Sequence, residues 1–202
     1  MVIDLVRADA DAPQLVGCTD AAPGSREVAG LEVLGDDTIL PRLRADGVTH
    51  AFVALGHNAR RQRVAMHAQA LGFTLFNAIS GRASISSSAR LGTGVAVMPG
   101  AVINASARIG DLVIVNSGAV VEHDVSVDDA AHVGPGSVLT GGAKLGTRAF
   151  LGAGACVIPG KAIGADSVVG AGACVVSDLP SGIVAFGVPA RVRRGADVWE
   201  DQ

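Results

Sequence analysis

Residues 127–157, VDDAAHVGPGSVLTGGAKLGTRAFLGAGACV, carry an aliphatic residue at every sixth position, from Val127 to Val157. Stepping outward by six in both directions extends this pattern without interruption from Ile79 to Val175. Seventeen positions follow it, and all are isoleucine, leucine or valine: Ile79, Ile85, Leu91, Val97, Ile103, Ile109, Val115, Val121, Val127, Val133, Leu139, Leu145, Leu151, Val157, Ile163, Val169 and Val175. Because these residue types make up only about a quarter of an average protein, chance does not account for the run.

A period of six fits neither an α-helix nor an isolated β-strand. An α-helix needs apolar residues at a spacing of about 3.6 and an isolated strand at a spacing of two. Six residues instead accommodate a short strand and a turn, and three such units predict one triangular coil. Coils stack at about 4.8 Å per layer through strand-to-strand hydrogen bonds. The seventeen hexads therefore predict a parallel β-helix of roughly five to six coils. The period leaves the hand of the coil open, and general chirality rules favour a right-handed one.

The residues before Ile79 lack this period and predict a small α/β unit. Short strands are expected at residues 14–18, 31–34 and 50–55, and a helix at residues 59–71 that ends at Gly72. Asn58 is the expected N-cap of that helix. Strands and helices that alternate with such connections are typical of a parallel sheet, whose ligands bind at the carboxyl ends of the strands.

The composition excludes several functional classes. A hydrophobic content of 49% with only 3% aromatic residues and 27 glycines describes narrow layers of small aliphatic side chains. The net charge of -3 supplies no basic field for nucleic acid. Residues 1–8 include Asp4 and Arg7 and are too short to span a bilayer, so we expect a cytoplasmic protein without membrane insertion. The three cysteines form no CxxC pair and predict neither a zinc ribbon nor a disulfide framework.

Polar residues that break the small-residue pattern between the aliphatic positions are the candidates for chemistry, because a β-helix alone is only a scaffold. The clearest such break is residues 116–124, NSGAVVEHD, where Glu122, His123 and Asp124 stand together at one corner. An imidazole beside a carboxylate is the usual arrangement of a general base, because the ring is neutral at cellular pH and the carboxylate stabilises the imidazolium that forms. The alternative is a solvated corner with three polar residues.

A second histidine, His132, follows His123 after nine residues, which is half a coil. Within one chain the two side chains are therefore expected to point from different corners, and they can share a site only across a subunit boundary. Cys156 and Cys174 are eighteen residues apart and are expected to stack one coil above the other as space-filling residues.

The sequence resembles the hexapeptide-repeat sugar O- and N-acetyltransferases of the NeuD/PglD type over essentially the whole chain. The resemblance is carried by the hexads, the His123-Asp124 corner, Ala131-His132, the Gly-Ala-Gly of residues 152–154 with Pro159-Gly160, and the Gly-Val-Pro-Ala-Arg of residues 187–191. It implies a left-handed β-helix with a small nucleotide-binding domain before it. It also implies a homotrimer with active sites at subunit interfaces.

The resemblance implies direct transfer from acetyl-CoA, without a metal. His123 would be the general base, tuned by Asp124, and a backbone N–H at Gly141 would stabilise the oxyanion. The other residues that would line the same site are Asn116, Glu122 and His132. The residues expected to contact acetyl-CoA are Gly141, Gly152, Ala153, Gly187 and Arg191.

The N-terminal unit departs from the family pattern. Relatives begin with a strand and a glycine-rich loop before the first helix, whereas residues 1–6 already have the pattern of that helix, so a truncated Rossmann-like unit is expected. Contacts to a nucleotide sugar are expected from Asp20, Gly56 and Asn58. The chain is therefore expected to contain three segments: the nucleotide-sugar-binding domain at 1–78, the β-helix at 79–179 and a C-terminal cap at 180–202.

The expected activity is acetyl-CoA-dependent N-acetylation of a nucleotide-linked amino sugar, such as a UDP-4-amino sugar, in glycan biosynthesis. O-acetylation of a sialic-acid-type sugar would use the same base and remains an alternative. A zinc hydratase needs three histidine ligands, of which the repeat supplies two, and is a more remote alternative. The last alternative is a non-catalytic β-helix scaffold.

Overall fold

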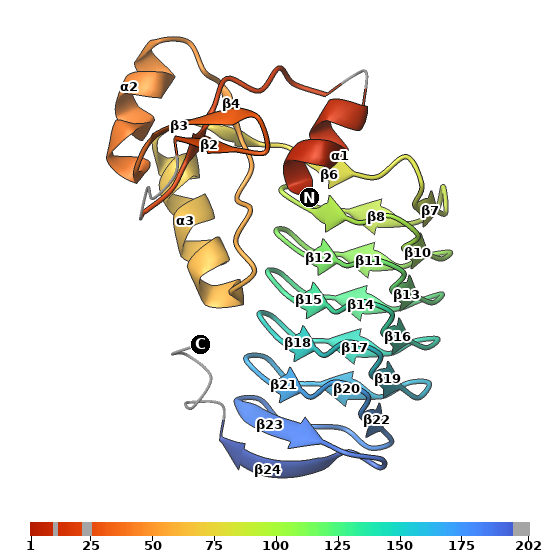
Figure 1. Cartoon of the computed structure of the whole chain (residues 1–202). Coiled ribbons are helices and arrows are strands. Elements are labelled where there is room, and N and C mark those ends of the chain that lie inside the picture. Colours follow the sequence, from red (N-terminus) through yellow and green to blue (C-terminus); the bar gives the residue numbers. More distant parts are fainter. Residues whose placement is uncertain (10–11, 22–25, 196–202) are drawn as a thin grey trace.

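The largest part of the protein is a parallel β-helix, seen from the side in Figure 1. The computed structural model describes residues 1–9, 12–21 and 26–195. The first sheet of the β-helix contains β6 (Ala78–Ile79), β9 (Ala96–Val97), β12 (Ile114–Val115), β15 (His132–Val133), β18 (Phe150–Leu151) and β21 (Val168–Val169). The second contains β7 (Ser84–Ile85), β10 (Val102–Ile103), β13 (Val120–Val121), β16 (Val138–Leu139), β19 (Cys156–Val157) and β22 (Cys174–Val175). The third contains β8 (Arg90–Leu91), β11 (Arg108–Ile109), β14 (Ser126–Val127), β17 (Lys144–Leu145) and β20 (Ala162–Ile163).

Each strand pairs with the strand eighteen residues further along, so that Val102 lies beside Val120 and Val120 beside Val138. This register confirms the predicted stack of three-sided coils. The second residue of each strand is the hexad residue and points inward, because side chains alternate along a strand. From Val97 to Val175 every hexad residue is at most 4% exposed, and together they form one continuous core.

Successive coils approach so closely that some corner positions exclude a Cβ atom. A Cβ on Gly152 would lie 2.5 Å from the amide nitrogen of Ala171 in the next coil. Other corner positions require a left-handed backbone, and non-glycine residues adopt it where the coil demands, as at Leu112 (φ 61°) and Ala130 (φ 55°). The many glycines therefore reflect two separate constraints of the corners.

The two ends of the β-helix are covered. At the start, α1 (Val2–Ala8) packs Leu5 and Val6 against Ala78 and Ala96. At the other end, β23 (Ile183–Phe186) pairs in parallel with β21, and β24 (Arg191–Gly195) folds back antiparallel to β23. Ala185 lies in the core below the last hexads. The expected cap thus extends the first sheet, and the remainder of the 180–202 segment, 196–202, lies outside the described residues.

The N-terminal unit has two small sheets instead of the single parallel sheet that was expected. One contains β1 (Cys18–Thr19), β3 (Leu31–Gly35) and β2 (Glu27–Val28), in which β1 and β3 are parallel and β2 is antiparallel to β3. The other contains β4 (His50–Ala51) and β5 (Thr74–Leu75) in parallel. A 3-10 turn (Asp37–Ile39) and the helix α2 (Leu40–Ala45) connect β3 to β4, and the helix α3 (Asn58–Ala70) connects β4 to β5. Among the described helices, none combines the length and apolarity that crossing a bilayer requires.

The expected helix is confirmed as α3, but its predicted N-cap is wrong. His57 is the N-cap, and its Nδ1 accepts a hydrogen bond from the amide of Arg60 at 3.2 Å. Asn58 is instead the first helical residue, and its side-chain amide donates to the carbonyl oxygens of Arg148 and Ala149 on the β-helix. A tertiary contact therefore replaces the local capping bond that residue type alone favours.

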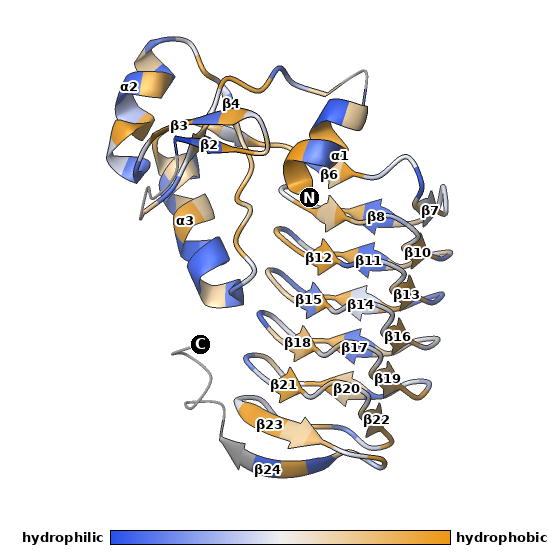
Figure 2. Cartoon of the chain, viewed as in Figure 1, coloured by the Kyte–Doolittle hydropathy of each residue, from blue (hydrophilic) through white to orange (hydrophobic). Residues whose placement is uncertain are grey.

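The three outer faces of the β-helix differ in character, as the hydropathy colouring of Figure 2 shows. The first sheet is covered by α1 and the N-terminal unit. From β10 to β22, the outward residues of the second sheet form a half-buried apolar column, here called the apolar face: Val102, Val120, Val138, Cys156 and Cys174. The outward residues of the third sheet include three exposed cations, Arg90, Arg108 and Lys144.

Truncation of one hexad side chain tests whether the core carries the stability of the β-helix. Leu145 is fully buried, so we expect Leu145→Ala to lower the free energy of unfolding by about 2 to 5 kcal/mol, through lost burial and an unfilled cavity. Lys144→Ala, one residue earlier on the exposed face, is the control and changes it by less than about 0.5 kcal/mol. Urea denaturation measures both, and equal effects of the two substitutions would contradict the assignment of the core.

Candidate active site

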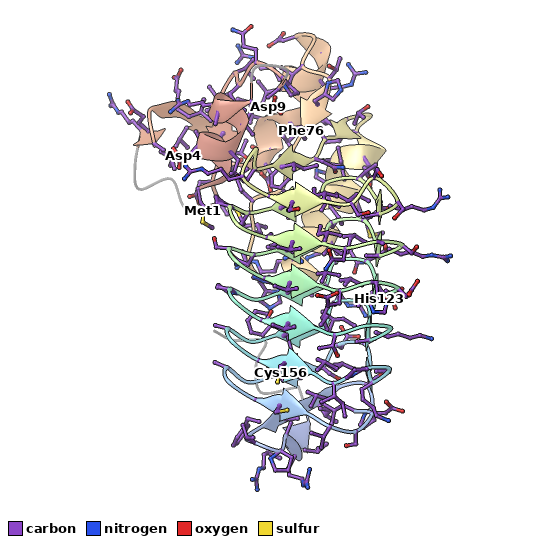
Figure 3. All side chains as sticks on the ribbon, turned by 90° about the vertical axis from the view of Figure 1, so that its right-hand side faces the viewer. Met1, Asp4, Asp9, Phe76, His123 and Cys156 are labelled. Carbon is purple, nitrogen blue, oxygen red and sulfur yellow. The ribbon has the colours of Figure 1, made fainter. Side chains whose placement is uncertain are left out.

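His123 lies two residues after β13, on the corner between the second and third sheets (Figure 3). Its Nδ1 lies 2.9 Å from Oδ2 of Asp124, and the two side chains are 63% and 67% exposed. Asp124 has a left-handed backbone (φ 60°), the conformation that this corner requires. The amide of His123 lies 3.4 Å from Oε2 of Glu122. The structure thus brings Glu122, His123 and Asp124 together as expected.

The two carboxylates favour the protonated ring of His123. The hydrogen bond with Asp124 is the largest cause that raises the pKa of His123 above its ordinary value, and the charges of Asp124 and Glu122 act in the same direction. Desolvation acts in the opposite direction. In the neutral ring, Nδ1–H donates to Asp124, which leaves the lone pair on Nε2. His123 is therefore a strengthened base whose free nitrogen is Nε2.

Gly141 lies one coil below His123 and forms the surface against which the ring packs. A Cβ on Gly141 would lie 2.7 Å from both Cε1 and Nε2 of His123, so only glycine admits the ring in this position. Within the described residues, neither Nε2 of His123 nor the amide of Gly141 makes a hydrogen bond. A proton acceptor and an N–H donor thus lie side by side at an exposed corner.

Asn116 and His132 form a second polar pair, near the N-terminal unit. Asn116 accepts a hydrogen bond from the amide of Ser117 through Oδ1 at 2.8 Å, so its Nδ2 is the group that lies 3.0 Å from Nε2 of His132. An amide donates there, so Nε2 is the acceptor and the proton of the neutral ring is on Nδ1. The ring also meets Phe150 edge to face at 5.0 Å between centroids.

Burial keeps His132 neutral. Desolvation lowers its pKa to about 4, and the positive charge of Arg61 acts in the same direction. No hydrogen bond of standard geometry reaches the buried Nδ1 from the described residues, although the backbone of Gly56 opposes the shift. His132 is therefore a neutral hydrogen-bonding group at physiological pH and not a base.

The other expected contacts of the cosubstrate lie away from His123 within one chain. Gly152 and Ala153 occupy the corner between the first and second sheets. Gly187 (φ 101°) joins β23 to β24, and the exposed Arg191 opens β24 and donates to its neighbour's carbonyl. Of the glycines in this set, Gly141 alone would place a Cβ against the His123 ring. A single chain does not bring the two histidines together either, because His132 faces the N-terminal unit from the first sheet.

The expected nucleotide contacts are divided between the two small sheets. Asp20 follows β1, and its amide donates to the carbonyl of Gly35 at 2.9 Å. Gly56 and Asn58 lie at the start of α3, and both accept hydrogen bonds from the guanidinium of Arg61. Those two residues are therefore held together, whereas Asp20 comes from a separate sheet.

The sequence interpretation missed Arg61. Its side chain is only 1% exposed, and burial lowers its pKa to about 10. A signal was present, because Ala65 and Ala68 are buried on the same helix at spacings of four and seven from Arg61. Arg60 and Arg63 lie close to Arg61 in the sequence and are exposed, so residue type alone did not distinguish the buried arginine from its neighbours.

Among the described residues, no group of three or more histidine, cysteine, aspartate or glutamate side chains is placed to hold a metal ion.

Comparison with known proteins identifies the class through solved structures, since no protein-family model and no curated protein matches the chain. Perosamine N-acetyltransferase from Caulobacter crescentus is 50% identical, with a TM-score of 0.92 over 95% of this chain and 90% of that one. It was solved with CoA and GDP-perosamine, including variants of one histidine. The acetyltransferase domain of PglB from Neisseria gonorrhoeae, solved with acetyl coenzyme A, is 33% identical, with a TM-score of 0.89 over 95% of this chain and 93% of that one.

WeeI from Acinetobacter baumannii is 20% identical, with a TM-score of 0.70 over 95% of this chain and 93% of that one, and shows the shared fold. The repeat and the histidine–carboxylate corner thus define a hexapeptide-repeat acyltransferase that uses acetyl-CoA. Within that class, the chain belongs to the NeuD/PglD-type sugar acetyltransferases.

Removal of one carboxylate tests the electrostatics of the corner. Asp124 raises the pKa of His123, so we expect Asp124→Asn to lower that pKa toward its ordinary value. Nuclear magnetic resonance titration of the ring protons measures the shift. Asp128→Asn removes an exposed carboxylate from a different corner and is the matched control. An identical His123 pKa in the two variants would contradict the assigned pairing.

Proposed function

We propose that this protein transfers the acetyl group of acetyl-CoA to the amino group of a nucleotide-linked amino sugar, a step of glycan biosynthesis. The observation that carries the proposal is the His123-Asp124 pair packed over Gly141, in a chain 50% identical to perosamine N-acetyltransferase. The substrate class is that of the relative solved with GDP-perosamine. A cytoplasmic location belongs to the same proposal, because the cosubstrate is acetyl-CoA.

The proposed reaction needs no covalent enzyme intermediate. The sugar amine attacks the thioester carbonyl of acetyl-CoA, and Nε2 of His123 takes the proton that the nitrogen loses. Asp124 stabilises the imidazolium, and the amide of Gly141 donates to the oxyanion. Collapse of the tetrahedral intermediate breaks the carbon–sulfur bond, and the imidazolium returns its proton to the departing thiolate of CoA. The products are the N-acetyl sugar and CoA.

The proposed substrate contacts come from both parts of the chain. Asp20, Gly56 and Asn58 contact the nucleotide sugar. Glu122 and Asn116 make supporting contacts around the acyl group. The pantetheine and phosphates of acetyl-CoA run past Gly152, Ala153, Gly187 and Arg191.

The proposed assembly is a homotrimer of left-handed β-helices. The apolar face supports it, because a column of valines and cysteines on a flat sheet is typical of a surface that is covered in the functional assembly. Side-by-side packing also lets the exposed His123 of one copy meet the partner's His132, which its own chain does not achieve. The active sites then lie at subunit interfaces.

O-acetylation of a sialic-acid-type sugar is the second candidate, because the same His123 pair serves a hydroxyl acceptor. Purified protein with acetyl-CoA is assayed against GDP- and UDP-linked amino sugars and against free and nucleotide-activated sialic acids. Acetylation of sialic acids alone would overturn N-acetylation. Stoichiometric zinc on elemental analysis would favour the zinc hydratase. Inactivity with every acceptor would favour a non-catalytic β-helix scaffold.

Removal of the imidazole tests the proposed base. We expect His123→Ala to lower kcat by a factor on the order of 10² to 10⁴, because proton transfer in the transition state is lost. His67→Ala, at an exposed position of α3, is the control and retains activity. Steady-state kinetics at pH 7.5, about one unit above the ordinary histidine pKa, measures both. Unchanged kcat in His123→Ala would contradict the mechanism.

A charge on the apolar face tests the assembly. Val120 lies within that face, between Val102 and Val138, so we expect the wild type to have the mass of three chains and Val120→Glu to dissociate it and lose activity. Ser126→Glu makes a similar change on the third sheet and preserves the trimer. Light scattering after size-exclusion chromatography reports the mass. A monomeric wild type would contradict the proposed assembly.

A further inference from the structure

Arg61 is the one buried charged residue in the described part of the chain. Burial of an unpaired cation is strongly unfavourable unless its donors are satisfied. No described carboxylate forms a salt bridge with it, so oxygen atoms of the backbone and one side-chain amide satisfy the guanidinium instead.

The donors of Arg61 face two parts of the chain at once. Toward the N-terminal unit, Nη1 donates to the carbonyls of Leu55 at 3.0 Å and Gly56 at 3.2 Å, and Nη2 donates to Oδ1 of Asn58 at 2.9 Å. Toward the β-helix, Nε donates to Leu112 at 2.8 Å and Nη2 to Ala130 at 2.7 Å. One planar group therefore ties the loop of residues 55–58 to two coils.

The oxygens on the β-helix belong to a regular column. Leu112, Ala130 and Arg148 are eighteen residues apart and occupy the same left-handed corner position of successive coils, with φ of 61°, 55° and 57°. Arg61 takes the first two carbonyls, and Nδ2 of Asn58 donates to the third at 2.8 Å. The register of the β-helix thereby fixes where the loop lies.

Arg61 also reaches the surroundings of His132. Nη2 lies 3.4 Å from the carbonyl oxygen of Ala131, the residue that precedes His132. The charge of Arg61 disfavours protonation of the His132 ring. Because the neutral ring accepts from Asn116 through Nε2, the guanidinium preserves that hydrogen bond as well.

We propose that Arg61 is a positioning residue that fixes loop 55–58 on the β-helix and thereby determines the affinity for the nucleotide sugar. It acts through Gly56 and Asn58, which it holds with direct hydrogen bonds, and it does not touch the His123 corner. The proposal rests on the proposed function, in which these two residues contact the nucleotide.

Three variants test this role: Arg61→Met, Arg61→Lys and the control Arg63→Met, which changes an exposed arginine of the same helix. We expect Arg61→Met to raise the KM for the nucleotide sugar by about ten- to a hundredfold, the range for losing hydrogen bonds to a charged group. The KM for acetyl-CoA stays within about threefold, because Arg61 makes no hydrogen bond to the residues assigned to that cosubstrate. Arg61→Lys gives an intermediate KM, since an ammonium reaches fewer of the oxygens. Equal increases of both KM values would overturn the proposal.

Two measurements need no substrate and separate this proposal from the proposed function. Amide hydrogen exchange at residues 55–58 should be at least about tenfold faster in Arg61→Met than in Arg63→Met. The His132 ring should titrate at higher pH in Arg61→Met. If Arg61→Met does not fold, Arg61→Lys carries both measurements with smaller shifts of the same sign. Unchanged exchange in the folded variant would overturn the positioning role, whereas a wild type inactive on nucleotide sugars would overturn the function alone.

Discussion

The eighteen-residue register of the parallel strands is the constraint on which the rest of the structure depends. Backbone hydrogen bonds join the strands of successive coils, so from β6 to β22 each strand residue lies beside the residue eighteen positions away. A side chain at a corner is therefore shaped by its neighbour in the next coil. The ring of His123 fits in its position because the residue eighteen positions later, at 141, is glycine. The same register places Cys156 beside Cys174. The register converts a local repeat into a set of fixed long-range contacts.

One core supports three outer faces because inward and outward residues alternate along each strand. The inward residues are interchangeable aliphatic side chains, and they carry stability without distinguishing one face from another. The outward residues decide what each face does: the first sheet receives the N-terminal unit, the second is apolar and the third presents cations. The proposed base, His123, lies at a corner, where the chain leaves the core and polar residues are free of the repeat.

The periodic part of the chain was predictable from sequence, whereas in the aperiodic part α3 and β3 were predictable but the arrangement of the sheets was not. Each hexad residue repeats the same environment, so a single rule placed all the coils, and the His123 corner was visible as an interruption of that rule. The N-terminal strands are mostly two residues long and have no period, so their division into two sheets left no local signal. Asn58 illustrates the limit: its side chain favours an N-cap in isolation, but the carbonyl of Arg148, ninety residues away, takes it instead.

The two histidines of the repeat show how the fold assigns opposite roles to one residue type. His123 is exposed at a corner beside Asp124, which raises its pKa, whereas His132 lies in a strand beneath the N-terminal unit, where burial and Arg61 lower its pKa to about 4. A spacing of nine residues is half a coil, so it necessarily places them on different sides of the β-helix. Of these two histidines, only His123 can exchange a proton near neutral pH. His132 is then a fixed acceptor for Asn116, and its neutrality depends on the same guanidinium that holds the N-terminal loop, so the β-helix and the N-terminal unit cannot be altered independently at this point.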